Sequence, residues 1–181
     1  ELLSSEAAEV IEHNAETILE EIGIEFRRDP ESLRLWREAG ADVRGERVRM
    51  PRGLCRQLIS TAPREFTLHA RNPERSVRFG GDATVFSPVG GPPFVSDLDR
   101  GRRYGTLEDL HNFIKLAHVA PAIHFLGGCM VEPMDVPEGK RHLDVQYAFF
   151  RYSDLGGEGT PETPGHALDA VRMAQILFGA D

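Results

Sequence analysis

The chain is poor in cysteine, which excludes several classes of small protein. Its 181 residues contain two cysteines, Cys55 and Cys129, which lie far apart and belong to no paired metal-binding or redox motif. A secreted domain held together by disulfides needs more cysteine than this, at closer spacing. The composition therefore favours a reduced, cytoplasmic compartment.

Long apolar runs and excess positive charge are also absent. No stretch approaches the roughly 20 apolar residues that cross a bilayer, and the first residues lack a basic and then apolar signal pattern. Acidic residues outnumber basic ones by 29 to 21, for a net charge of -8. The pairs Arg27-Arg28 and Arg102-Arg103 are too short for a nucleic-acid surface. We expect neither a membrane nor a nucleic acid as partner.

The common catalytic signatures are missing as well. The chain has no phosphate-binding loop, no dinucleotide fingerprint and no Ser/His/Asp arrangement. What remains is ordinary globular composition, 40% hydrophobic and 28% charged, in a length that can bury a sizeable core. These features indicate a soluble α/β protein.

Helical signals dominate the first 62 residues. Apolar residues recur at helical spacing from Ser4 to Ile22, and Gly23 stands where such a helix would end. Asp29-Pro30-Glu31 supplies the cap, proline and acid of a second helix, which Gly40 ends. We expect a small hairpin over residues 43–50 and a third helix from Pro51 to about Ala62.

Strand signals follow. Phe66, Leu68 and Ala70 alternate with polar residues, and the alternation resumes at Val77 and Phe79 after a turn, which predicts a β-hairpin. Two further short strands are predicted at Val85–Phe86 and Phe94–Val95, with a turn at Asp99-Arg100-Gly101.

The pattern changes again at Thr106. Thr106 and Asp109 form a capping box for a helix to about His118, and Ile123–Leu126 reads as a short strand. Two more helices are predicted, around residues 143–149 and from His166 to Phe178. Helix, strand and helix in succession suggest βα units built on a parallel sheet.

Several segments, in order, resemble the trimethylamine methyltransferase family, which includes glycine betaine methyltransferases. Each segment is weak alone, but their order along nearly the whole chain is fairly specific. They are residues 18–23, residues 63–73 (Pro63-Arg64-Glu65-Phe66 through Asn72-Pro73), residues 86–93, residues 106–110 and Val136-Pro137.

The resemblance implies a longer protein with a (β/α)8 TIM barrel, which typically needs about 250 residues. Residues 1–105 would form a helical and β-hairpin extension, and residues 106–181 the first βα units of a barrel that this chain does not close. The sequence departs from the family after Ser153-Asp154, where Leu155-Gly156-Gly157 replaces the expected Lys-Pro and aromatic residue. The departure falls where the resemblance implies that the next barrel strand opens.

The resemblance also implies an activity. Such an enzyme moves a methyl group from a small methylated amine, trimethylamine or a quaternary amine such as glycine betaine, to the cobalt of a separate corrinoid protein. It would bind no cofactor directly, because the cobalamin-type corrinoid is carried by the partner, and we expect a homo-oligomer. The alternative is a non-catalytic segment that serves as a scaffold or oligomer-docking piece.

Recognition of a quaternary ammonium depends on aromatic faces and carboxylates, since the group has no N–H donor. Paired glycines between prolines suit a binding loop, although a tight strand connection is an equal alternative. For aromatic rings, including Tyr104 and Phe125, core packing is the more common role. The predicted substrate-binding residues are Phe86, Pro88, Gly90, Gly91, Phe94, Gly127 and Gly128.

Three histidines, His111, His118 and His124, are close enough in sequence to raise a metal hypothesis. No cysteine pair completes a familiar zinc pattern, and we favour structural or surface roles, so no metal site is predicted. Glu132 and Asp135 could orient a substrate, but nothing identifies them as an acid and base pair. The catalytic residues are not identified.

Overall fold

The computed structural model describes residues 3–157 and 161–179, and the chain is a mixed α/β protein with small sheets. It divides into two compact units, an amino-terminal unit, Glu1–Pro63, and a carboxy-terminal unit, Arg64–Asp181. Within the described ranges, no helix is long and apolar enough to span a membrane.

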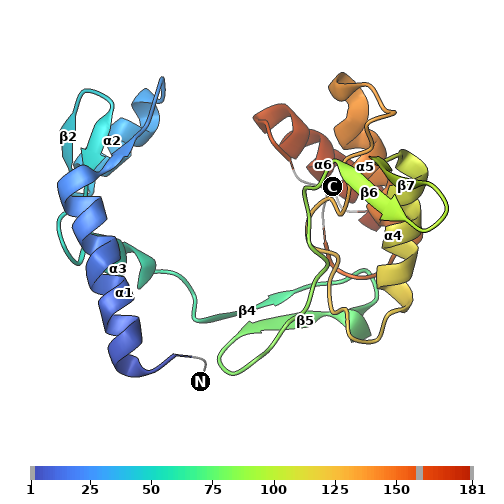
Figure 1. Ribbon diagram of the computed structural model, residues 1–181, viewed down its shortest axis with the longest axis horizontal. Helices are drawn as coiled ribbons and strands as arrows, with labels where there is room; N and C mark the ends of the chain where they lie inside the picture. The colour runs from blue at the N-terminus through green and yellow to red at the C-terminus, as the bar shows by residue number, and fades with distance from the viewer. Residues whose placement is uncertain (1–2, 158–160, 180–181) are drawn as a thin grey trace. The chain divides into compact units, whose positions relative to one another are not determined.

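The amino-terminal unit contains the predicted helices and hairpin (Figure 1). Its elements are α1 (Ser5–Thr17), η1 (Ile18–Ile22), β1 (Ile24–Glu25), α2 (Pro30–Glu38), β2 (Asp42–Arg44), β3 (Arg47–Arg49) and α3 (Leu54–Ile59). The third helix is shorter than predicted at both ends. Gly53, in the left-handed region at φ 80°, precedes its first residue, so the chain between Pro51 and Gly53 cannot be helical.

Side chains cap the starts of the first two helices, and the cap at Asp29 is the one predicted from the sequence. The Ser4 hydroxyl accepts a hydrogen bond from the Ala7 N–H, and the Asp29 carboxylate accepts one from Ser32 at 3.0 Å. Strand β1 was not predicted, because two residues carry no readable alternation. It pairs antiparallel with β3, so that the central strand of this small sheet carries Val48, which is fully buried.

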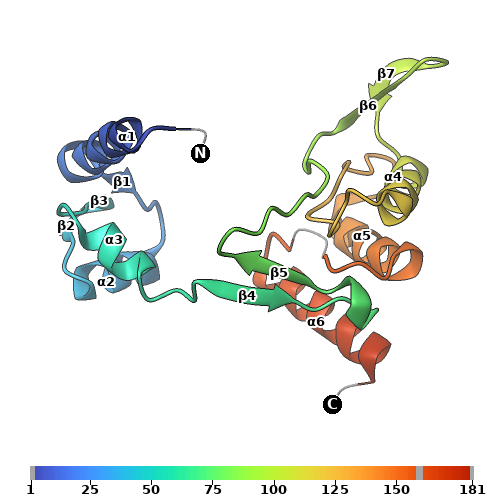
Figure 2. The ribbon, with the colours of Figure 1, turned by 90° about the horizontal axis from the view of Figure 1, so that it is seen from below.

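The carboxy-terminal unit combines two hairpins with three long helices (Figure 2). The predicted hairpin is present, with Phe66 opposite Phe79, and a second hairpin pairs Phe94 with Tyr104. The helices confirm the capping and periodicity signals. The elements are β4 (Glu65–Leu68), η2 (Pro73–Arg75), β5 (Val77–Gly80), β6 (Phe94–Asp97), β7 (Gly101–Tyr104), α4 (Leu107–Val119), α5 (Glu138–Tyr152) and α6 (Pro164–Phe178).

Two predicted strands, Val85–Phe86 and Ile123–Leu126, are not formed, and this part of the prediction was wrong. The two segments do meet: the His124 N–H donates to the Phe86 carbonyl at 3.0 Å. The return bond from the Phe86 N–H goes to the His124 ring nitrogen Nδ1 at 2.9 Å, instead of a backbone carbonyl. A side chain thus takes the place of the next ladder bond. All strand pairs among the described residues are antiparallel.

The core of this unit lies between its helices and the segment that follows α4. Helix α5 packs against both α4 and α6. Leu110 and Ile114 of α4 and Phe149 of α5 are almost fully buried, and such side chains each contribute about 1.5–3 kcal/mol. No residue of helix α6 is fully buried, although several are partly buried.

Two arginines next to the β4–β5 turn hold the ends of the helices. Arg71 donates to the carbonyls of Phe150, at 2.6 Å, and Ser153, at 3.0 Å, at the end of α5. Arg75 donates to the carbonyl of His118 and to the Asp154 carboxylate, both at 3.1 Å. Because helix ends leave carbonyls without intrahelical partners, these bonds fix where α4 and α5 end.

Candidate functional site

The glycine–proline loop is held against the segment after Leu126. The Gly91 N–H donates to the Cys129 carbonyl at 2.7 Å, and the Glu132 N–H donates to the Pro92 carbonyl at 3.0 Å. A Cβ added at Gly90 would lie 3.1 Å from the Cys129 carbonyl oxygen. Gly90 therefore permits the close contact that brings the two predicted glycine pairs together, and Gly91 adopts a φ of 94° that favours glycine.

The predicted aromatic residues are distributed differently. Phe86 is exposed, and its ring stacks on His124 with centroids 5.8 Å apart. Phe94 makes its ring contacts within its own hairpin: it stacks on Tyr104 at 4.7 Å, and the Arg102 guanidinium lies 4.1 Å from its ring centroid. Pro88 lines a shallow apolar groove beside α4.

Gly127 and Gly128 line an open, mostly apolar cavity of about 840 Å³. Phe79 stacks on Phe66 with centroids 4.9 Å apart and meets the edge of Phe125 at 5.2 Å. No carboxylate lies among the described residues that line it. This aromatic cavity suits apolar or methylated groups, with Arg71 as a positive charge on its wall.

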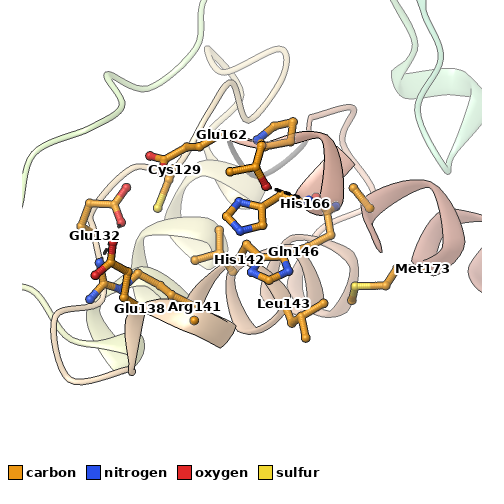
Figure 3. Close-up of a pocket in the computed structure, with 15 residues that line it drawn as sticks. Cys129, Glu132, Glu138, Arg141, His142, Leu143, Gln146, Glu162, His166 and Met173 are labelled. Carbon is orange, nitrogen blue, oxygen red and sulfur yellow. Dashed lines mark hydrogen bonds and ion pairs between the residues drawn. The ribbon is translucent and has the colours of Figure 1, made fainter. Parts of the chain in front are cut away.

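A second cavity, of about 520 Å³, lies between the Cys129–Glu132 segment and the first turns of α5 and α6 (Figure 3). We call it the histidine cavity, because the imidazoles of His142 and His166 stack on one wall with centroids 3.8 Å apart and planes 14° apart. Its charged lining side chains are Glu132, Glu138, Arg141 and Glu162.

Asp169 of α6 orients the stacked imidazoles through His142. His142 Nε2 lies 3.1 Å from the Asp169 carboxylate, so in the neutral ring Nε2 carries the proton and Nδ1 is an acceptor. The Nδ1 atoms of His142 and His166 are buried without a hydrogen-bond partner among the described residues. The carboxylates outnumber the single arginine, which lies 3.9 Å from Glu132, so the lining carries a net negative charge.

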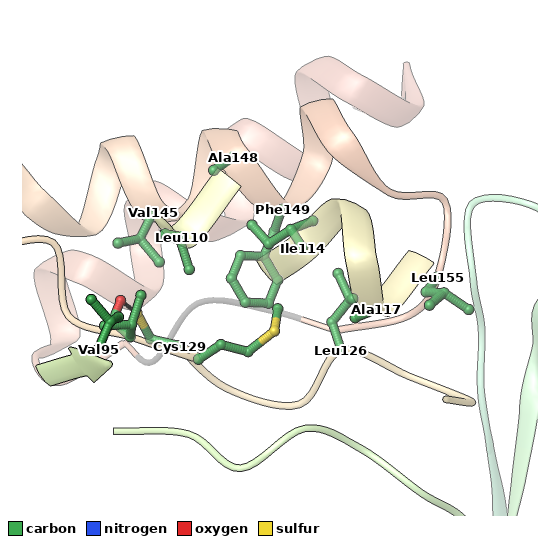
Figure 4. Close-up of a cluster of buried hydrophobic side chains, with 12 residues drawn as sticks. Val95, Leu110, Ile114, Ala117, Leu126, Cys129, Val145, Ala148, Phe149 and Leu155 are labelled. Carbon is green, nitrogen blue, oxygen red and sulfur yellow. Dashed lines mark hydrogen bonds between the residues drawn. The ribbon is translucent and has the colours of Figure 1, made fainter. Parts of the chain in front are cut away.

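Cys129 reaches this cavity from the core (Figure 4). Burial, assisted by the negative charge of Glu132, raises the pKa of the Cys129 thiol to about 12. The thiol donates to the Val131 carbonyl at 3.0 Å. A protonated, buried thiol is a packing group and a poor nucleophile near neutral pH.

The three histidines considered for a metal go to three different places. The His111 ring lies against that of Tyr152 at a tilt of 47°, His118 lies 3.3 Å from Asp154, and His124 binds the backbone of Phe86. Across residues 3–157 and 161–179, no three histidine, cysteine or acidic side chains are grouped to hold a metal ion. The metal-enzyme alternative therefore has no support in this arrangement.

Of the two carboxylates noted in the sequence, only Glu132 lines a cavity. Asp135 accepts a hydrogen bond from the Leu107 N–H at 2.8 Å and so caps α4. The histidine cavity was not predicted from the sequence. Glutamate precedes histidine by four residues at Glu138 and His142 and at Glu162 and His166, but the same spacing occurs at Glu9 and His13 and at Glu65 and His69, so it does not single out this cavity.

Comparisons with known proteins place the chain in a family. It belongs to the trimethylamine methyltransferase (MTTB) family, whose model matches residues 1–181. It is 45% identical over 178 residues to a glycine betaine methyltransferase of Desulfitobacterium hafniense (strain Y51), covering 98% of this chain and 37% of that protein. It is also 26% identical over 140 residues to a proline betaine:corrinoid methyltransferase of Eubacterium limosum, covering 76% of this chain and 28% of that protein.

The chain thus spans under two fifths of the length of either relative. The match confirms the family that the ordered segments indicated.

Proposed function

We propose that the full-length enzyme transfers a methyl group from a small methylated amine to the cobalt of a corrinoid protein. The observation that carries this proposal is the 45% identity to a glycine betaine methyltransferase over nearly the whole chain. The name of the second relative adds the corrinoid acceptor. Both names specify quaternary betaines, which favours a quaternary amine over trimethylamine as the methyl donor.

The fold proposal accompanies it: residues 106–181 supply the first βα units of a (β/α)8 TIM barrel, and residues 1–105 the extension before it. One backbone bond supports this reading, because the Leu126 N–H donates to the Gly156 carbonyl at 2.8 Å, as neighbouring barrel strands do. In such barrels the active site borders the loops that enter the helices. The histidine cavity borders the starts of α5 and α6.

In the reaction, the C–N bond of the ammonium breaks as the methyl carbon bonds to reduced cobalt, and the amine leaves with the electron pair. The residues of this chain act on the donor. Carboxylates at Glu132, Glu138 and Glu162 attract the cationic nitrogen, and the wall of stacked imidazoles limits how it can turn.

The predicted loop residues form part of the same proposal. The Gly91 N–H holds the loop against Cys129, and Gly127 and Gly128 line the aromatic cavity. That cavity shares lining residues with the histidine cavity and offers ring faces to the methyl groups of an amine whose nitrogen the carboxylates attract. Phe86, Pro88 and Phe94 are proposed as further contacts to the substrate, although they line neither the aromatic nor the histidine cavity. We further propose a cytoplasmic homo-oligomer that binds the corrinoid protein and no cofactor of its own.

Methyl transfer from trimethylamine, glycine betaine and proline betaine to a reduced corrinoid protein tests the proposal with the full-length enzyme. We expect methyl-cobalt formation with at least one quaternary betaine. Failure with every amine, by an enzyme that still binds the corrinoid protein, would instead favour the scaffold alternative.

A further inference from the structure

An uncovered apolar seam runs along helix α1 and ends at Ile18, the first residue of η1. Ala8, Ile11, Ala15 and Ile18 follow one another at intervals of three, four and three residues, the spacing that keeps side chains on one side of a coiled-coil helix. All four residues are exposed; Ile11 is 57% and Ile18 55% accessible. An exposed seam of this kind is typical of a helix that pairs with another.

The side by which α1 joins its own unit is a different one. Glu12 forms an ion pair with Arg56, and Glu16 and Glu20 form ion pairs with Arg52 at 3.7 and 3.1 Å. These glutamates recur every four residues and so follow one line along the helix. The seam is therefore a second contact surface, which is not used within the amino-terminal unit.

We propose that the seam binds the α1 seam of a second copy of this chain in an antiparallel pair. In an antiparallel coiled coil, each a position of one helix faces a d position of the other. Ala8 therefore lies opposite Ile18 of the second copy, and Ile11 lies opposite its Ala15. Each large side chain then meets a small one, and the helix dipoles oppose each other. The seam specifies a surface for the homo-oligomer proposed above.

The charges beside the seam fit a self-complementary contact. Near the two-fold axis, Glu12 of one copy lies beside Glu12 of the other on one side of the seam. The two copies of Asn14 meet on the opposite side. Each Glu12 already carries Arg56 as its partner, so no uncompensated like charges meet. The glutamates at positions 6 and 9 lie away from the seam.

Sedimentation of the full-length protein, at matched concentrations, tests the pairing. We expect the wild type to contain an even number of copies and Ile18→Glu to halve the mass, because the exposed side chain is not needed for folding. Val10→Glu is the matched control: Val10 is also 55% exposed but lies off the seam, so the mass should be unchanged. A monomeric wild type, an unchanged Ile18→Glu assembly or a halved Val10→Glu assembly would overturn the proposal.

Disulfide trapping tests the orientation. A mixture of Ala8→Cys and Ile18→Cys proteins should form the mixed disulfide, whereas Ala8→Cys alone should give no more cross-linked product than the wild type. Efficient self-linking of Ala8→Cys would indicate a parallel pair, and no mixed product would remove the seam as the contact. Methyl transfer is not measured in either experiment, so failure here is separate from failure of the proposed function.

Discussion

Arg103 and Asp109 form a two-pronged ion pair at the start of α4. The guanidinium donates to the two carboxylate oxygens at 2.5 and 2.7 Å, and the same carboxylate accepts from the Thr106 N–H at 2.9 Å. A hydrogen bond from Arg103 is the main reason that the pKa of Asp109 lies well below its usual range. The capping box read from the sequence is thus linked to strand β7.

Replacing Asp109 with asparagine should reduce the free energy of unfolding by about 1–2 kcal/mol at pH 7. A lowered carboxyl pKa means that the stabilisation is present above the ordinary value, near 4, and is lost as the pH falls into the strongly acid range. The difference between wild type and variant should therefore vanish there. Denaturant unfolding at several pH values measures it; Thr106→Ala, which removes a neutral cap, should keep its deficit in acid.

Gly23→Ala should destabilise the amino-terminal unit by about 3 kcal/mol or more. Gly23 has φ 71°, and a Cβ there would lie 2.2 Å from the Val48 carbonyl oxygen, which is backbone and cannot move aside. Gly40 is the matched control: its φ is 98° but its Cβ would meet nothing within 4 Å. Thermal melting of Gly40→Ala should show only a conformational cost of about 1–2 kcal/mol. Equal losses would show that the close contact is unimportant.

Arg75→Met should lower stability by about 2 kcal/mol, because it removes charge-assisted bonds to the His118 carbonyl and to Asp154 in a partly buried place. Arg78→Met removes an exposed ion pair with Glu65 and should change stability by less than about 0.5 kcal/mol. Chemical denaturation compares the two variants. A loss of stability for Arg78→Met as large as that for Arg75→Met would show that the bonds of Arg75 to the ends of α4 and α5 contribute no more than an exposed ion pair.

The Cys129 thiol should resist modification in the folded protein at pH 7 to 8. Burial keeps its pKa near 12, so almost no thiolate is present in that range. Titration with a thiol reagent should label only Cys55 until denaturant is added, and Cys129→Ala should leave the native labelling unchanged. Rapid native labelling of two thiols would show that Cys129 is accessible.

Local signals in the sequence predicted the helices well. Caps such as Thr106 with Asp109, and Asp29 before Pro30, act within a few residues, so the chain needs no tertiary information to begin a helix there. The strand at Ile123–Leu126 failed for the opposite reason. An apolar run does not identify the strand with which it would pair. Here His124 Nδ1 accepts the hydrogen bond from the Phe86 N–H that a backbone carbonyl would accept in a sheet.

The candidate site shows the same limit. The sequence identified the Gly90-Gly91 and Gly127-Gly128 pairs, and the structure joins the segments that carry them through Cys129. The histidine cavity depends on α5 packing against α6, which brings His142 onto His166 from positions 24 residues apart. The spacing of glutamate and histidine could not have identified it, because Glu9 and His13, which do not line the cavity, have the same spacing.

In the proposed function, the acidic lining of the histidine cavity binds the methylated amine. Steady-state kinetics of the full-length Glu132→Gln enzyme with glycine betaine test it most directly, with Glu108→Gln, an exposed glutamate on α4, as the control. We predict that Glu132→Gln raises the KM for the amine about five- to tenfold, since one attractive charge of roughly 1 kcal/mol is lost, while the KM for the corrinoid protein is unchanged. An amine KM equal to that of Glu108→Gln and the wild type would show that Glu132 does not help to bind the amine.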